Sequence, residues 1–196
     1  EFNKFNPQFT VNNRGELVRI YDEPTFSRID AEWREHFKLP FWTHTLSARL
    51  RGGTILGPTQ DDFFDFYVGG LIGMRGYPYY ALGGNEVATL NVTYRFPILE
   101  EIDFRVLHLT FGRLYGALFG EFGNAWNGTQ TKLRDFKSNA GFEVRLESWS
   151  FYAYPTKIFF GGAYGFDRFT RIINEEPFTY GKEWRFYFGV LFDFEV

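Results

Sequence analysis

Apolar and polar residues alternate along much of this chain, and the alternation is clearest near its end. Every second residue from Trp184 to Phe194 is apolar, and the residues between them are mostly polar or small. Successive side chains of a β-strand point to opposite faces, so the pattern predicts a strand with one apolar face. Its length exceeds the usual five or six residues of a strand. It matches the roughly 9–11 residues that cross a membrane.

The same period of two recurs upstream and predicts about eight strands, whereas no segment shows helical periodicity of useful length. The predicted strands cover residues 17–21, 28–37, 43–51, 87–96, 113–126, 140–147, 158–166 and 182–194, and the first shows the weakest pattern. We therefore expect an all-β chain forming part of a transmembrane antiparallel β-barrel. A soluble β-sandwich is the alternative fold.

Composition favours the membrane wall over the sandwich. Aromatic residues make up 22% of the 196 residues and include 26 Phe, which indicates either a large aromatic core or the lipid-facing wall of a barrel. The net charge of −3 and the lack of a basic cluster argue against nucleic-acid binding. Cysteine is absent, which excludes disulfides and thiol chemistry. The chain begins at Glu1 without Met or a signal peptide, so we expect further sequence upstream.

Residues 52–86 interrupt the predicted strands for more than thirty residues without clean alternation. A loop of this length is usually functional or disordered. It is rich in Gly, Tyr and Phe, so we expect it to pack against the rest of the protein. Several glycines surround Arg75 and Tyr77, which predicts a tightly folded backbone that presents a guanidinium group. Taken alone, Arg-Gly-Tyr is also compatible with an ordinary surface turn.

Three motifs follow one another in a set order: Met-Arg-Gly-Tyr at 74–77, Phe-Gly-Glu-Phe-Gly at 119–123 and Gly-Phe-Glu-Val-Arg at 141–145. In this respect the chain resembles the BamA superfamily of outer-membrane assembly and secretion barrels, which includes TamA and the two-partner secretion transporters. In that family an extracellular loop folds back into the barrel lumen. Its Arg there pairs with an acidic residue of a Phe-Asp/Glu-x-Gly motif. The second motif here has one extra residue between Phe and Glu.

The resemblance implies a loop lock in which the 52–86 loop is held inside the lumen. Arg75 is costly in a partly dehydrated lumen unless it is paired, and a carboxylate is its natural partner. The alternation directs three charged residues inward, so a charge network is expected there. The predicted lock residues are Arg75, Gly76, Tyr77, Glu121, Gly123, Glu143 and Arg145. The alternative is that Glu121 merely lines a wet lumen.

The family barrel has sixteen strands, and a closed eight-stranded barrel leaves no room for so long a loop. We therefore expect residues 1–196 to be the C-terminal half of a sixteen-stranded barrel. The missing N-terminal strands, with any periplasmic domains, would lie elsewhere. The terminal aromatics Phe192 and Phe194 match the family's C-terminal strand signal for assembly, although the chain ends with Glu195-Val196.

The resemblance implies a bacterial outer-membrane protein that inserts or exports other proteins without covalent catalysis. Its partners would be the lipid bilayer and client outer-membrane proteins. The alternative function is a membrane anchor or pore for an attached module, such as a propeller or a patatin-like hydrolase. No catalytic motif is present, the three histidines are scattered without metal-ligand spacing, and no cofactor is expected.

Overall fold

The computed structural model describes residues 9–11, 13–19, 26–40, 43–57, 62–102, 104–128, 131–151, 154–173 and 176–192. The described chain is all-β, with three short 3₁₀ turns. Its strands are β1 (Phe9–Val11), β2 (Leu17–Arg19), β3 (Ser27–Lys38), β4 (Thr45–Leu56), β5 (Phe66–Val68), β6 (Leu82–Gly84), β7 (Glu86–Leu99), β8 (Phe104–Val106), β9 (Leu109–Trp126), β10 (Lys137–Ser150), β11 (Tyr154–Gly165), β12 (Phe169–Ile173), β13 (Glu176–Tyr180) and β14 (Trp184–Phe192). The 3₁₀ turns are η2 (Asp62–Phe64), η3 (Gly70–Ile72) and η4 (Leu133–Asp135). None of these described helical turns is long and apolar enough to cross a membrane.

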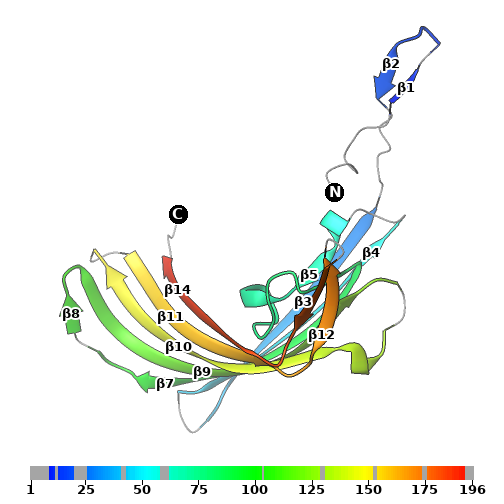
Figure 1. Cartoon of the computed structure of the whole chain (residues 1–196). Helices are drawn as coiled ribbons and strands as arrows, with labels where there is room; N and C mark the ends of the chain where they lie inside the picture. Colours follow the sequence, from blue (N-terminus) through cyan, green and yellow to red (C-terminus); the bar gives the residue numbers. More distant parts are fainter. Residues whose placement is uncertain are drawn as a thin grey trace.

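One eight-stranded antiparallel sheet dominates the chain. Seven long strands follow the order β14-β11-β10-β9-β7-β4-β3, and the short β8 pairs with β9 beside this path. The sheet is strongly curved and open, with β3 and β14 at its two ends (Figure 1). The all-β, antiparallel prediction is therefore confirmed. Each of the seven strands has at least nine residues, which is sufficient to span a bilayer.

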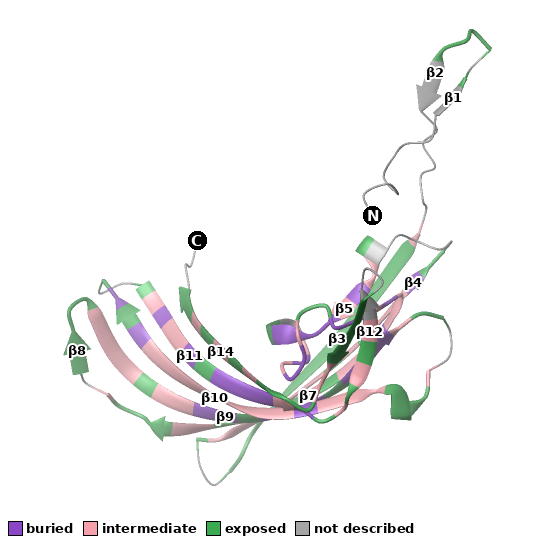
Figure 2. Cartoon of the chain, in the orientation of Figure 1, coloured by how far each residue is buried: buried purple, intermediate pink, exposed green. Residues whose placement is uncertain are grey.

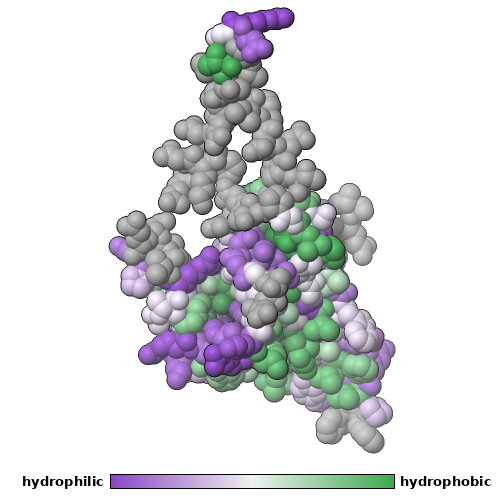
Figure 3. All heavy atoms as spheres, turned by 90° about the vertical axis from the view of Figure 1, so that its right-hand side faces the viewer, coloured by the Kyte–Doolittle hydropathy of each residue, from purple (hydrophilic) through white to green (hydrophobic). Residues whose placement is uncertain are grey.

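The convex face of this sheet is apolar although it is exposed. Large apolar side chains from all seven long strands lie on it. They include Ile29, Trp33, Phe37, Leu50, Leu90, Val92, Leu118, Phe122, Phe142, Phe160, Trp184, Phe186, Phe188, Val190 and Phe192. Viewed from the right-hand side of Figure 1, hydrophobic residues form an extended green area (Figure 3). So large an apolar surface normally marks contact with a partner or a membrane.

The concave face of the sheet is polar and holds residues 62–85, which come before β7. Residues 62–85 form a compact unit on this face, which we call the inserted segment (Figure 1). Its side chains pack with those of β4, β7 and β9 in one buried cluster. The cluster contains Ile55, Phe66, Val68, Met74, Tyr77, Ala81, Leu82, Val87 and Ala125. In Figure 2 buried residues lie in the inserted segment and in strands from β4 to β11, whereas β3 is exposed throughout.

Several elements differ from the alternation-based prediction. β2, within the first predicted strand, pairs only with β1 in a separate two-stranded sheet, and the eighth strand of the main sheet is β8. The β12–β13 hairpin was not predicted, because its two five-residue strands are too short to show a period. β4 continues through Leu56 and β7 begins at Glu86, so both ends of the predicted 52–86 loop belong to the sheet.

Glycines interrupt the alternating pattern near the end of β4, so the sequence did not predict this part of the strand. Glycines also allow the inserted segment to approach the sheet. A Cβ atom at Gly53 would lie 2.6 Å from the Phe66 ring, so this concave-face position must be empty for Phe66 to be buried. At Gly84, a Cβ atom would lie 2.2 Å from the carbonyl oxygen of Trp126. Both contacts lie well inside van der Waals distance. The inserted segment therefore rests directly on the backbone of β9.

Gly84→Ala tests this close packing. We expect the substitution to lift β6 from β9 and to lower the free energy of unfolding by about 1–3 kcal/mol, the usual cost of overpacking. Chemical denaturation of the purified chain measures this loss, and limited proteolysis within the inserted segment reports the loosening. Gly120→Ala on β9 is the matched control, because a Cβ atom there meets nothing within 4 Å. Equal stabilities of the two variants would contradict the packing.

Candidate functional site

A glycine-rich turn presents Arg75 at the tip of the inserted segment. Gly69 and Gly70 have φ angles of 140° and 67°, in the region that side chains strongly disfavour. The backbone N–H of Gly70 donates to the carbonyl of Tyr77 at 2.9 Å, and the N–H of Tyr77 donates to that of Met74 at 3.1 Å. These two hydrogen bonds close the turn that contains Arg75. Its side chain is therefore directed at the concave face of the sheet.

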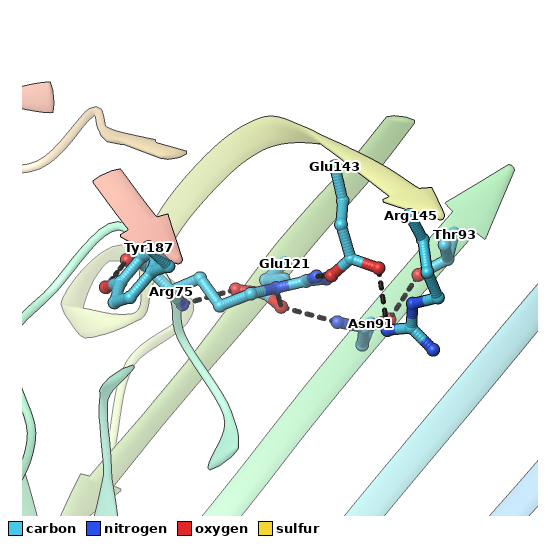
Figure 4. Close-up of polar contacts among 7 residues, drawn as sticks. All are labelled: Arg75, Asn91, Thr93, Glu121, Glu143, Arg145 and Tyr187. Atoms are coloured by element: carbon cyan, nitrogen blue, oxygen red, sulfur yellow. Dashed lines mark hydrogen bonds and ion pairs between the residues drawn. The ribbon is translucent and has the colours of Figure 1, made fainter. Parts of the chain in front are cut away.

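Arg75 binds Glu121 through both its backbone and its side chain. The backbone N–H of Arg75 donates to Glu121 Oε2 at 2.6 Å, and the guanidinium Nε–H donates to Oε1 at 2.8 Å (Figure 4). Glu121 lies in the second half of β9 and is 5% exposed. Two charge-assisted bonds to one buried carboxylate form a strong and geometrically demanding contact. The main chain of the inserted segment is thus joined to a side chain of β9.

Further polar groups of the concave face extend this pair into a network. The guanidinium of Arg75 also lies 3.6 Å from a carboxylate oxygen of Glu143 on β10, and Arg145 donates to the other oxygen of Glu143 at 2.7 Å. On the other side, the amide of Asn91 on β7 donates to Glu121 at 2.6 Å. Figure 4 shows Arg75 extended between the two carboxylates. Both glutamates therefore have cationic partners.

Two aromatic residues complete the surroundings of Arg75. Its guanidinium carbon lies 3.2 Å from the centroid of the Phe119 ring, so a cation–π contact covers one face of the group. The hydroxyl of Tyr187 on β14 donates to the carbonyl oxygen of Arg75 (Figure 4). Side chains of β9, β10 and β14 thus contact Arg75 directly, and Asn91 of β7 joins the network through Glu121. The tip is held across most of the width of the sheet.

The two residues after Arg75 are fixed by close packing and burial. A Cβ atom at Gly76 would lie 2.5 Å from that of Asn139, so only glycine fits there. Tyr77 is 0% exposed; its hydroxyl donates to the carbonyl of Ser138 at 2.9 Å and accepts the N–H of Asp167 at 3.0 Å. Burial raises the pKa of Tyr77 to about 12, so this hydroxyl remains a donor near neutral pH.

The β12–β13 hairpin provides a second attachment that the sequence did not reveal. Arg171 of β12 donates to the carbonyl of Tyr80 at 2.6 Å, and its guanidinium carbon lies 5.9 Å from the centroid of the Tyr67 ring. Phe169 packs against Tyr77 with ring centroids 5.5 Å apart. The inserted segment is therefore held both by the sheet and by this hairpin. The Tyr- and Phe-rich composition was the only sequence signal for it.

The structure brings six of the seven predicted lock residues into this contact region. They are Arg75, Gly76, Tyr77, Glu121, Glu143 and Arg145. Gly123 lies two residues farther along β9 and pairs with β7, where a Cβ atom would lie 2.8 Å from the Thr89 side chain. Phe192 ends β14 on the convex face, opposite Thr156. Phe194 lies outside the described residues.

The described residues contain no group of three or more His, Cys, Asp or Glu placed to hold a metal ion. The contacts described around Arg75 are ion pairs, hydrogen bonds and one cation–π contact. No protein-family model matches the chain, and no curated protein matches its sequence.

A double-mutant cycle on Arg75 and Glu121 tests the central contact. We expect Arg75→Ala to lower the free energy of unfolding by about 3–5 kcal/mol, because it leaves a buried carboxylate without its main partner. Glu121→Gln should then cost at least about 1 kcal/mol less in the Arg75→Ala background than alone.

Chemical denaturation of the four proteins gives this coupling energy. Arg134→Ala removes an arginine that pairs, among the described residues, with Asp135 alone, at 3.9 Å and in an exposed position, and the substitution should cost less than about 0.5 kcal/mol. Additive effects of the Arg75 and Glu121 substitutions would show that their contact contributes nothing to stability.

Proposed function

We propose that this chain is part of the wall of an outer-membrane β-barrel similar to the BamA superfamily, acting in the insertion or translocation of other proteins. The observation that carries the proposal is the contact between Arg75, at the tip of a segment that returns to the concave face, and Glu121 in the second half of β9. It joins the first two sequence motifs of the resemblance, and Glu143 and Arg145 of the third motif lie beside it. In this function no covalent bond is made or broken.

The distribution of polarity supports a lipid-facing wall. Lipid removes water from the convex face, where exposed aromatic and aliphatic side chains otherwise have no favourable contact. The ion pairs of the sheet, such as Arg51–Asp30 and Arg75–Glu121, lie on the concave face. A polar interior and an apolar exterior are the arrangement of membrane barrels. In a soluble sandwich the apolar face would instead be covered by a second sheet.

The direction of the strands specifies what would close the barrel. Each neighbouring pair along the seven-strand path is antiparallel, so the end strands β3 and β14 run in the same direction. Closure by antiparallel pairs therefore requires an odd number of further strands. A sixteen-stranded barrel requires nine of them, because this chain contributes seven long strands to the path. Open edges are costly in lipid because their backbone groups lack partners.

The proposed mechanism combines a rigid interior brace with strand addition at an edge. The inserted segment holds β7, β9, β10 and β14 in one curvature through Arg75, so that part of the wall is stiff. The free edge of the last strand, β14, presents backbone donors and acceptors that a client strand can pair with. The inserted segment, acting as the brace, keeps the curvature of the sheet constant while strand pairing at the edge changes.

Phe188→Arg tests whether the convex face lies in lipid. Phe188 is 72% exposed near the middle of β14, and an arginine at the bilayer midplane costs about 2–4 kcal/mol on the lipid face of a barrel. We expect the variant to insert less stably into liposomes, measured by urea-induced unfolding from the bilayer. Leu191→Arg is the matched control, because Leu191 is exposed on the opposite face of the same strand. Unchanged insertion of both variants would contradict a lipid-facing wall.

Arg75→Ala tests the role of the brace in function. We expect the full-length protein carrying this substitution to insert a client barrel into liposomes about tenfold more slowly, the effect of roughly 1.4 kcal/mol on a barrier. Arg75→Lys should recover only part of the rate, because lysine keeps the charge but lacks the planar fork. Normal client insertion by a variant whose inserted segment has become protease-sensitive would instead favour a passive membrane anchor.

A further inference from the structure

A cavity of about 270 Å³ lies on the concave face beneath the tip of the inserted segment. Leu71, Gly73 and Arg75 form its wall on the side of the inserted segment, and β3, β4, β7, β9 and β10 form the rest. Its charged lining consists of Arg34, Arg49, Arg75, Arg95, Arg145, Glu121 and Glu143. Five guanidinium groups thus face two carboxylates. The cavity carries an excess of positive charge.

Most of these charges are already neutralised by neighbours. Glu121 and Glu143 are held by Arg75 and Arg145, as described above. Arg34 and Arg49 share the carboxylate of Glu32 on β3, so this group of three retains one positive charge. The positive excess is therefore located on the side of the cavity formed by β3, β4 and β7.

Arg95 on β7 differs from the other arginines of the cavity. Within the part of the chain that the structure describes, it pairs with no carboxylate, and its one polar contact is with the Ser47 hydroxyl at 3.5 Å. It lies across the small side chain of Ala117 from Glu143 and Arg145. The buried Nε of Arg145 also has no hydrogen-bond partner among the described residues. Arg95 is therefore an arginine of the cavity lining whose charge has no carboxylate partner among the described residues.

We propose that this cavity is a binding site for a small soluble oxyanion of the phosphate class, with Arg95 as its principal ligand. A planar guanidinium group matches the oxygens of such an anion with two parallel hydrogen bonds. Arg49 and the Ser47 hydroxyl line the same side of the cavity and supply further donors. The site lies on the polar face, remote from the apolar convex face, and a soluble anion therefore fits it better than a lipid headgroup. This inference does not depend on the proposed function.

Titration of inorganic phosphate into the purified chain by calorimetry at low ionic strength tests the site. We expect saturable binding at one site. Arg95→Gln should raise the dissociation constant at least about tenfold, because it removes a charge-assisted contact. Arg95→Lys should give an intermediate constant. Since Arg95 pairs with no described carboxylate, its substitution strands no buried charge, and circular dichroism should show an unchanged β-sheet spectrum.

Arg134→Gln provides the control for a general loss of positive charge. Arg134 lies in the exposed η4 turn, outside the cavity lining, and its substitution should leave the dissociation constant unchanged. Two results would overturn the proposal: absence of saturable phosphate binding by the folded wild-type chain, or equal affinities of the wild-type chain and Arg95→Gln.

Discussion

The pairing of Arg75 with Glu121 is the interaction on which the interior of this structure depends. A guanidinium group and a carboxylate with little solvent access are each expensive, and only their mutual contact makes their positions tolerable. Removing one partner of this pair therefore leaves the other buried without a counter-charge. This destabilises the fold more than replacing both partners by apolar residues. Because Arg75 belongs to the inserted segment and Glu121 to β9, their contact also fixes how the buried apolar cluster of the inserted segment packs on the sheet.

The two faces of the sheet divide the tasks of the molecule. Polar contacts are concentrated on the concave side, where each has a specific partner and geometry determines position. Contacts on the convex side are apolar and have no direction, so they suit a fluid surrounding rather than a fitted partner. The curved sheet is thus specific on one face and permissive on the other. Such a division allows the interior to be stiff while the exterior adapts to its surroundings.

Sequence patterns predicted the parts of this arrangement that depend on local geometry. The period of two placed Glu121, Glu143 and Arg145 on one face, because side-chain direction in a strand requires only knowledge of the strand itself. The contacts of Tyr187 with Arg75 and of Arg171 with Tyr80 were not predicted. They depend on which strands become neighbours and on how a short hairpin docks, and these are long-range properties that a pattern of single residues does not contain.

The bond from Tyr187 to Arg75 links the centre of the sheet with its end. Tyr187 belongs to β14, which pairs only with β11 in the described sheet, so the last strand is attached at two points: along its backbone and through one phenol at the tip of the inserted segment. Separation of β14 from β11 therefore also withdraws a hydrogen bond from the residue that organises the interior. A change in pairing at the end of the sheet therefore removes a contact from its centre, through a single side chain.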